Sequence, residues 1–376
     1  MKQNKISSEE YKKRFKPKEE DIRGIFFRDQ TAIVHSLPFR RLKRKTQVFF
    51  APDNDHICTR IEHVLHVFTN STTILKGLID KGWKLDIEMA QAISLGHDVG
   101  HAPFGHAGEE VLKEIAGPGF YHEINSLRFV DHIAEKGIGL KLTYGVRDGI
   151  VSHCGEELKQ FIEPDWELRD LEDITELGKL PSSFEGCIVR VADKISSLGR
   201  DVEDAIELEI IDPKIFHEGV LEYLKIKSND AKYQFNRALL NNIIYDIIET
   251  TDAQEKIGMS DEGFKFIELI NKLSKENIYE AEKIRNYKYY VEKILKNIFY
   301  SLSELFDKYE YDFKSYKNHY IKSYEEFGRY LEAYEIFYKE TEADKTQILS
   351  DYISGMSDNY AINVQKDISI PKTVFK

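Results

Sequence analysis

Apolar residues in the second half of the chain repeat at the spacing of an α-helix. The repeat runs through Val291, Ile294, Leu295, Ile298, Phe299, Leu302, Leu305 and Phe306. This spacing places them on one face, so the segment predicts an amphipathic helix that packs on its neighbours. No proline lies between 214 and 370, and only five glycines do. Because these residues usually interrupt helices, we expect long helices throughout this region.

The first half of the chain carries two further helical patterns. One is the apolar stripe Ile61, Val64, Leu65 and Phe68, and the other is the run 86–95, whose small side chains permit close helix packing. The strand signal is weak and falls on 47–50. We therefore predict a mainly α-helical fold with few or no strands. A change in composition near 210 predicts two units, a motif-rich one over 1–210 and a Tyr- and Lys-rich helical one over 211–376.

Composition narrows the class of protein. The 376 residues are 41% hydrophobic and 31% charged, which is typical of a globular protein. No run approaches the roughly 18 apolar residues of a membrane span, and the N-terminus is charged, so we expect a cytoplasmic protein with no membrane partner. A net charge of -12 argues against general nucleic-acid binding, although a local basic cluster can still hold a small anion. Cys58, Cys154 and Cys187 are too scattered for a disulfide framework.

Histidines are concentrated in one part of the chain. Nine of the twelve lie between His56 and His153. The densest run is His-Asp-Val-Gly-His-Ala-Pro-Phe-Gly-His-Ala-Gly-Glu, over 97–109. We expect the helix that carries His97 and Asp98 to end within this run, at Gly100 and Pro103. The turn and the next helix then carry His101, His106 and Glu109.

Imidazole and carboxylate ligands together suit Zn, Fe, Mn, Co or Ni. We take His97 and Asp98 as the first two ligands of a divalent transition metal. His63 is a third, on a second face of its helix, and Asp193 is a fourth, a lone acid in an apolar helical run. Each has an alternative when taken alone: His63 as a groove histidine, and Asp193 as the ion-pair partner of Arg190 or Lys194. Taken together, the four predict one metal site.

At this point the chain resembles the HD phosphohydrolase superfamily, whose metal set is H…HD…D. More narrowly, it resembles the bacterial deoxyguanosine triphosphate triphosphohydrolase (dGTPase) family and its mammalian relative, the dNTP hydrolase with a sterile-alpha-motif domain. The matching segments are 39–49, 59–63, 97–109, 120–123, 192–195, 200–204 and 351–361. They extend over nearly the whole chain, and the run from His97 to Glu109 is specific.

The resemblance implies an HD-domain helical core over 1–210, with 211–376 completing it and making contacts in a homo-oligomer (a tetramer or hexamer). It implies one tightly held metal, a second Mg²⁺ carried by the substrate, and a dNTP hydrolysed at its α-phosphorus to deoxynucleoside and tripolyphosphate. His106 and Glu109 can then act as an oriented acid/base pair. His101 and His122 support that pair or donate to phosphate, unless they are polar turn residues.

The substrate-binding residues follow from the same resemblance. Arg60 and Lys194 can neutralise phosphate charge, unless they form surface salt bridges. Gln47 and Asp201 match family positions that recognise the 3′-hydroxyl of the sugar. Ser197 stands where bacterial relatives typically carry a sugar-stacking tyrosine, so the strictness of deoxyribose selection is open. Base preference is also open, because the family has guanine-selective and broad members.

Two other functions are compatible with parts of the pattern. One is an HD-type phosphatase or phosphodiesterase acting on nucleoside monophosphates or cyclic nucleotides, which shares the metal set but does not need Gln47, Arg60 or the segment 351–361. The other is a regulator that binds dNTP without turnover, for which a broken ligand set is expected.

Overall fold

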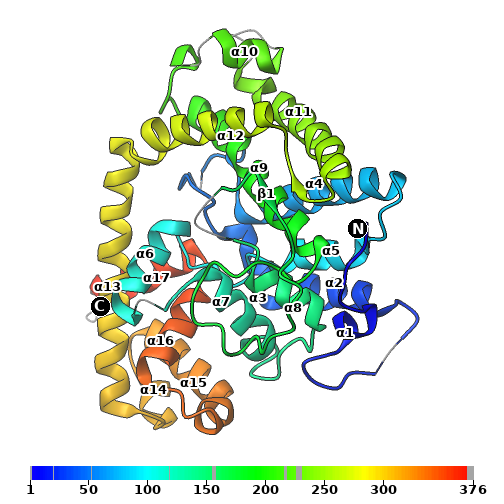
Figure 1. Ribbon diagram of the computed structural model, residues 1–376. Helices are drawn as coiled ribbons and strands as arrows, with labels where there is room; N and C mark the ends of the chain where they lie inside the picture. Colours follow the sequence, from blue (N-terminus) through cyan, green and yellow to red (C-terminus); the bar gives the residue numbers. More distant parts are fainter. Residues whose placement is uncertain are drawn as a thin grey trace.

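The computed structural model describes residues 2–19, 21–51, 53–117, 119–154, 158–215, 218–225 and 231–370, and most of them are helical (Figure 1). The helices of the first half are α1 (Ser8–Lys12), α2 (Ile25–His35), α3 (Leu37–Arg41), α4 (Arg60–Asp80), α5 (Ile87–Gly96), α6 (Gly105–Ala116), α7 (His122–Arg128), α8 (Tyr144–Val151) and α9 (Phe184–Glu207). Those of the second half are α10 (Glu218–Leu224), α11 (Ala231–Gln254), α12 (Asp261–Ser274), α13 (Glu282–Tyr309), α14 (Phe313–Lys317), α15 (Lys322–Glu340), α16 (Lys345–Ser354) and α17 (Asp358–Ser369).

Short irregular helices and one small sheet complete the described chain. Leu42–Arg44 and Pro213–Ile215 are 3₁₀ turns, and Phe129–Ile133 and Lys275–Tyr279 are π-helical turns. Strand β1 (Phe161–Ile162) pairs antiparallel with β2 (Ile257–Gly258). The predicted fold class, mainly α with few strands, is confirmed. Among the described residues, no helix is long and apolar enough to cross a membrane.

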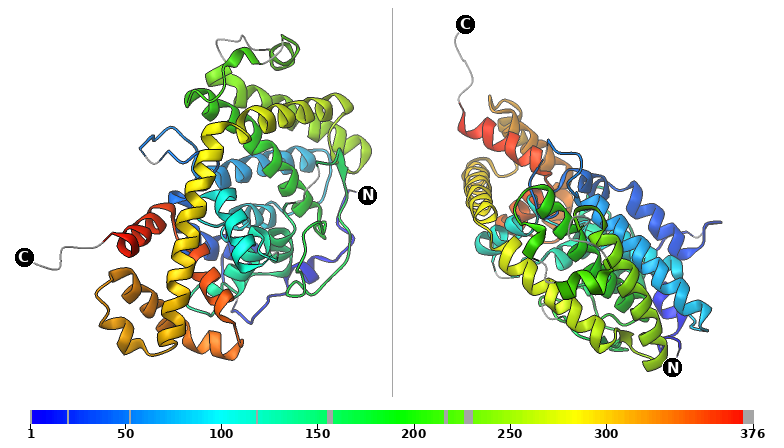
Figure 2. Two further views of the ribbon diagram at one scale, coloured as in Figure 1. Left: turned by 90° about the vertical axis from the view of Figure 1, so that its left-hand side faces the viewer. Right: turned by 90° about the horizontal axis from the view of Figure 1, so that it is seen from above.

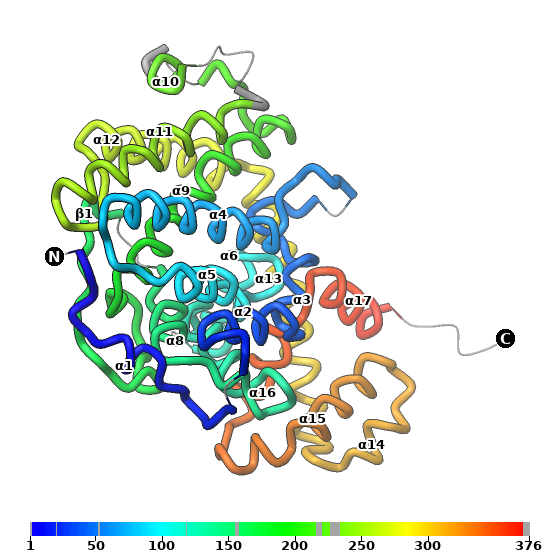
Figure 3. Tube along the Cα trace, turned by 90° about the vertical axis from the view of Figure 1, so that its right-hand side faces the viewer, coloured from blue at the N-terminus to red at the C-terminus, as the bar shows by residue number. Residues whose placement is uncertain are grey.

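Helix α9 lies at the centre of the larger apolar core. It packs against α4, α5 and α8 and also against α11 and α12 (Figures 1 and 3). Buried residues of all these helices belong to one cluster, which includes Ile74, Ile93, Ile188 and Leu239. This core therefore continues from α9 into α11, across the unit boundary predicted near 210, and the division into two units remains a prediction.

A second apolar cluster joins α6 to the C-terminal helices. Helix α13 runs along the outside of the molecule from α12 towards α14 (Figures 1 and 2). The side of α13 that carries Leu295, Ile298 and Leu302 is buried against α6, α16 and α17. The amphipathic helix predicted over 291–306 is thus confirmed. By packing on α6, it holds in place the helix that follows the histidine-rich turn.

Three details differ from the sequence predictions. The strand predicted at 47–50 is wrong: these residues are irregular, and nearby Thr46 forms only an isolated bridge with Thr59. The reason is that the Thr46 and Gln47 carbonyls accept hydrogen bonds from the Arg60 guanidinium, at 3.1 and 3.3 Å, instead of joining a ladder. Helix α5 also ends earlier than predicted, at Gly96, and Gly100 donates its N–H to Ser126 of α7.

The apolar stripe on α4 is rotated relative to the prediction. Leu65 is 46% exposed, whereas Val67, Asn70 and Ile74 are buried. Because α5, α9 and α11 all pack on α4, its buried surface is wider than one stripe and includes the face that carries His63. The polar residues of that face are therefore inside the protein.

Candidate active site

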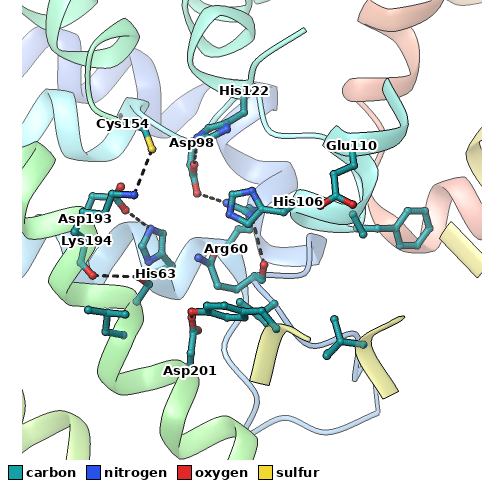
Figure 4. A pocket seen from close by; sticks show the side chains of 18 of the residues that line it. Arg60, His63, Asp98, His106, Glu110, His122, Cys154, Asp193, Lys194 and Asp201 are labelled. Carbon is teal, nitrogen blue, oxygen red and sulfur yellow. Dashed lines mark hydrogen bonds and ion pairs between the residues drawn. The ribbon is translucent and has the colours of Figure 1, made fainter. Parts of the chain in front are cut away.

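Three helices bring the predicted metal ligands together. Helix α4 begins at Arg60, where Thr59 and Glu62 form a reciprocal capping box, and its first turn carries His63. His97 and Asp98 follow the end of α5 in a buried turn. Asp193 projects from the middle of α9 towards His63 (Figure 4).

The donor atoms of these residues converge. The Nε2 of His63 lies 3.0 Å from Oδ1 of Asp193, and the Nε2 of His97 lies 3.9 Å from the same oxygen. The potential metal-ligand atoms of His63, His97 and Asp98 all lie within 4.8 Å of one another. The cluster can therefore hold a divalent metal: the ligand atoms need to move together only slightly for each to reach a metal–ligand distance of about 2.0–2.2 Å.

The hydrogen bonding of His97 fits a ligand role. Its Nδ1 lies 2.7 Å from the Ser94 carbonyl, which can only accept, so Nδ1 carries the proton. Its Nε2 is buried and has no hydrogen-bond partner among the described residues. An unpaired buried polar atom is costly, and a cation beside the neighbouring carboxylates removes that cost.

The carboxylates of this cluster are held in their charged form. Burial raises the pKa of Asp98, but the Arg60 guanidinium and the nearby histidines outweigh it and place the pKa well below its usual range. Burial likewise raises the pKa of Asp193, and the hydrogen bond from His63 reverses the shift. Ionised carboxylates and a neutral His97, whose pKa burial lowers, are the forms that bind metal.

A second group lies beside the first, around the carboxylate of Glu109. Its Oε2 is 2.9 Å from Nδ1 of His122, 3.6 Å from Nδ1 of His106 and 3.9 Å from Nε2 of His101. His101 and His122 stack with ring centroids 4.5 Å apart. His106 differs from the others because its side chain is 63% exposed. The residues predicted as catalytic are thus brought together, with His106 the one open to solvent.

The electrostatics of this group favour a charged pair. Burial lowers the pKa of His122, but the carboxylates of Glu123 and Glu109 outweigh it and raise the pKa to about 9. Burial raises the pKa of Glu109, and the histidines around it reverse the shift. Glu109 therefore holds His122 by a hydrogen bond and faces the more exposed His106 across 3.6 Å.

A cavity of about 390 Å³ opens next to these two groups (Figure 4). All four predicted substrate-binding residues line it: Gln47, Arg60, Lys194 and Asp201. The Gln47 Oε1 is buried without a hydrogen-bond partner among the described residues, so it is free for a ligand. Ser197 lines the same cavity, and its hydroxyl donates to the Lys194 carbonyl at 3.2 Å.

Arg60 is buried and forms an ion pair inside the protein. It is 2% exposed, and its Nη1 donates to Asp98 Oδ2 at 2.6 Å. The alternative of a surface salt bridge is therefore wrong for Arg60: the ion pair is buried and adjoins the metal cluster. Lys194 is more exposed than Arg60, and its Nζ lies 3.7 Å from the Cys154 sulfur.

Sequence reasoning missed three residues of this region. His153 lies at the end of α8, with its ring centroid 4.8 Å from that of His97. Its membership of the histidine-rich segment was the available signal. Tyr279 donates its hydroxyl to Asp201 Oδ2 at 2.7 Å, and Tyr287 of α13 also lines the cavity. No local motif marks these two tyrosines, because they come from the helical second half.

The helical fold and the His/Asp cluster are those of an HD-domain protein. The HD domain family model matches residues 60–198. Relatives named "Deoxyguanosinetriphosphate triphosphohydrolase-like protein" match nearly the whole chain. One from Caldanaerobacter subterraneus subsp. tengcongensis is 31% identical over 95% of this chain and 88% of its own length. One from Desulfatibacillum aliphaticivorans is 34% identical over 93% and 89%, and one from Clostridium perfringens is 32% identical over 94% and 90%. The chain belongs to this dGTPase-like family of HD-domain proteins, as its motifs predicted.

Proposed function

We propose that this protein hydrolyses deoxynucleoside triphosphates, dGTP or several dNTPs, to deoxynucleoside and tripolyphosphate in a metal-dependent reaction. One observation carries the proposal: the His/Asp cluster and the Glu109 group adjoin one cavity, which is lined by Gln47, Arg60, Lys194 and Asp201. A cavity of about 390 Å³ falls within the range of small-molecule sites. The names of the relatives support the same substrate class.

His63, His97, Asp98 and Asp193 are the residues that would hold the metal. A bound divalent metal supplies Lewis acidity, which makes water a better nucleophile and withdraws charge from a phosphoryl oxygen. Mn, Fe, Zn, Co and Ni all suit this ligand set, and we expect a Mg²⁺ ion to accompany the triphosphate.

The protein's own side chains position the triphosphate and move a proton. Lys194, which is partly buried at the cavity, neutralises phosphate charge, and the buried Arg60 adds positive charge to the same cavity. His106 is the exposed histidine of the Glu109 group, so it can reach the departing 5′-oxygen or the attacking water. Glu109 holds the ring, and His101 and His122 support the pair from inside the protein.

The nucleoside is expected at the other end of the cavity. Asp201 and Gln47 offer an acceptor and an amide to the 3′-hydroxyl. Tyr279, Tyr287 and Ser197 line the same cavity, and the small side chain of Ser197 takes up less of it than a tyrosine would. Discrimination against ribonucleotides is therefore expected to be incomplete.

The test is a product assay. Purified protein is incubated with each dNTP and rNTP in Mn²⁺ or Mg²⁺, and tripolyphosphate is resolved from pyrophosphate and orthophosphate. Tripolyphosphate from a dNTP supports the proposal. Orthophosphate from a nucleoside monophosphate would favour an HD phosphatase instead, and tight dNTP binding without product would favour a regulator.

We further propose that the protein acts in the cytoplasm as a homo-oligomer, a tetramer or hexamer. The exposed tyrosines of α13, Tyr289, Tyr290 and Tyr300, offer aromatic surface of the kind enriched at subunit contacts. Size-exclusion chromatography with light scattering measures the assembly, and a monomer at micromolar concentration would contradict it.

A further inference from the structure

Asp98, His122 and His153 form a separate group of donors beside the predicted metal cluster. Their ligand atoms all lie within 4.8 Å of one another, and all three side chains are buried. The Nε2 of His122 is 3.9 Å from Asp98 Oδ1, and the Nε2 of His97 is 3.8 Å from that same oxygen. This oxygen of Asp98 thus lies between the imidazole of His97, in the predicted metal cluster, and that of His122, in the second group.

The two additional histidines are oriented as metal ligands usually are. His153 has its Nδ1 2.6 Å from the Ile150 carbonyl, which can only accept, so Nδ1 carries the proton. His122 directs its Nδ1 to the Glu109 carboxylate at 2.9 Å. Metal-binding histidines typically donate one ring N–H to a carbonyl or carboxylate and present the other nitrogen to the ion. His97 shows the same arrangement with Ser94.

The surrounding charge also suits a cation. Glu123, next to His122, is 1% exposed, and its Oε2 has no hydrogen-bond partner among the described residues. It lies 3.3 Å from His122 Nδ1. Burying this carboxylate is unfavourable unless positive charge lies close by, which a second cation beside His122 would supply.

We infer that Asp98, His122 and His153 hold a second divalent transition-metal ion, with Asp98 shared between the two metals. Two donors on one ion, each at about 2.0–2.2 Å, are at most about 4.4 Å apart, so binding needs only a slight contraction. Imidazole nitrogen favours Mn, Fe, Co, Ni or Zn over Mg²⁺, which prefers oxygen ligands. The site therefore differs from that of a Mg²⁺ ion carried by the substrate, because the protein alone supplies its ligands.

This inference rests on the proposed function only through Asp98, the shared ligand. It changes the role of His122, which gives up the Nε2 proton of its charged form when the ion binds and becomes a ligand held by Glu109 instead of a donor to phosphate. His106 is then left as the group of that cluster available for proton transfer. The two proposals can fail separately, because His63 serves only the first ion and His153 only the second.

The experiment counts Mn²⁺ bound to the full chain without nucleotide. Metal-free protein is titrated with Mn²⁺ by calorimetry, and the loaded protein is examined by electron paramagnetic resonance. We expect two Mn²⁺ per wild-type chain, with the spectrum of an exchange-coupled pair. His153→Asn and His63→Asn should each bind one ion and lose the coupling. His56→Asn, which changes an exposed histidine, should keep both.

The outcomes are decisive. Saturation of the wild type at one Mn²⁺ per chain, or two ions retained in His153→Asn, overturns the second site. One ion that is lost only with His63→Asn leaves the proposed function intact, whereas no binding at all contradicts both proposals. If His153→Asn does not fold, as judged by its circular dichroism, the wild-type count and the coupling decide alone.

Discussion

The guanidinium of Arg60 lies 2.6 Å from Oδ2 of Asp98, and both side chains are almost fully buried. The pair joins the first turn of α4 to the turn after α5. One oxygen of Asp98 is thereby engaged by Arg60, and the other is left facing His97 and His122. The same ion pair therefore helps to position a predicted metal ligand, Asp98, and a residue that lines the cavity, Arg60.

Asp98→Asn should abolish hydrolysis and lower metal content while the protein stays helical. Asparagine keeps the shape and can still accept from Arg60, but it removes the negative charge that a cation needs. Loss of a charged partner from a buried pair costs about 1–3 kcal/mol when a hydrogen bond remains, so the melting temperature should fall. Activity, metal analysis and circular dichroism measure this. Asp173→Asn is the exposed control; full turnover in Asp98→Asn would refute the metal assignment.

His106→Ala should reduce kcat without changing metal content or thermal stability. The side chain is 63% exposed, so little packing is lost. Removal of a general acid or base typically costs about 10²- to 10⁴-fold in rate. The comparison is with His63→Ala, which should lose both activity and the first metal. An unchanged kcat in His106→Ala, measured at several pH values, would remove His106 from the proposed proton transfer.

Asp201→Asn should stabilise the ligand-free protein more at pH 8 than at pH 4. Burial raises the pKa of Asp201 from 3.8 to about 7, even though Tyr279 donates to it. Below about pH 4 both folded and unfolded chains are protonated there, and no difference arises. As the pH rises to about 7, only the unfolded chain ionises, so wild-type stability falls, and above that it stays at the lower level.

The size of this effect is on the order of a few kcal/mol, since one pKa unit corresponds to about 1.4 kcal/mol. The measurement is the difference in melting temperature between Asp201→Asn and wild type across the pH range. Asp173→Asn, which changes an exposed carboxylate, is measured in parallel as the control. A flat difference for Asp201→Asn would mean that Asp201 ionises at the same pH in the folded and the unfolded chain, so that burial does not raise its pKa.

Gly100→Ala should destabilise the protein and weaken metal binding together. A Cβ at Gly100 would lie 2.2 Å from the backbone nitrogen of Ser126, so α7 or the turn that carries His97 and Asp98 must move. Such overpacking costs about 1–3 kcal/mol. Gly119→Ala, where a Cβ meets nothing within 4 Å, is the matched control. Wild-type melting and wild-type Mn²⁺ affinity in Gly100→Ala would show that this turn is more adaptable than its contacts indicate.

Much of the helical framework could be predicted from local patterns, since backbone geometry alone sets the helical period. The stripe over 291–306 lies in α13 and buries Leu295 and Ile298 as expected. The side of α4 that is buried could not be predicted, because it depends on how many helices cover it, and Leu65 is exposed as a result. The 47–50 segment likewise follows a tertiary contact, that of the Arg60 guanidinium.

The ligand types were visible in the sequence, because imidazole and carboxylate side chains cluster in few segments and carry a distinctive chemistry. Their meeting was decided by tertiary packing: His63 and Asp193 are 130 residues apart in sequence and touch only because α4 packs on α9. His153 and Tyr279 show the same limit. His153 belongs to the histidine-rich segment, but its sequence does not show that it meets His97, and no local motif marks Tyr279. Short-range spacing determines what one helix presents, whereas interhelical packing determines which side chains share a cavity.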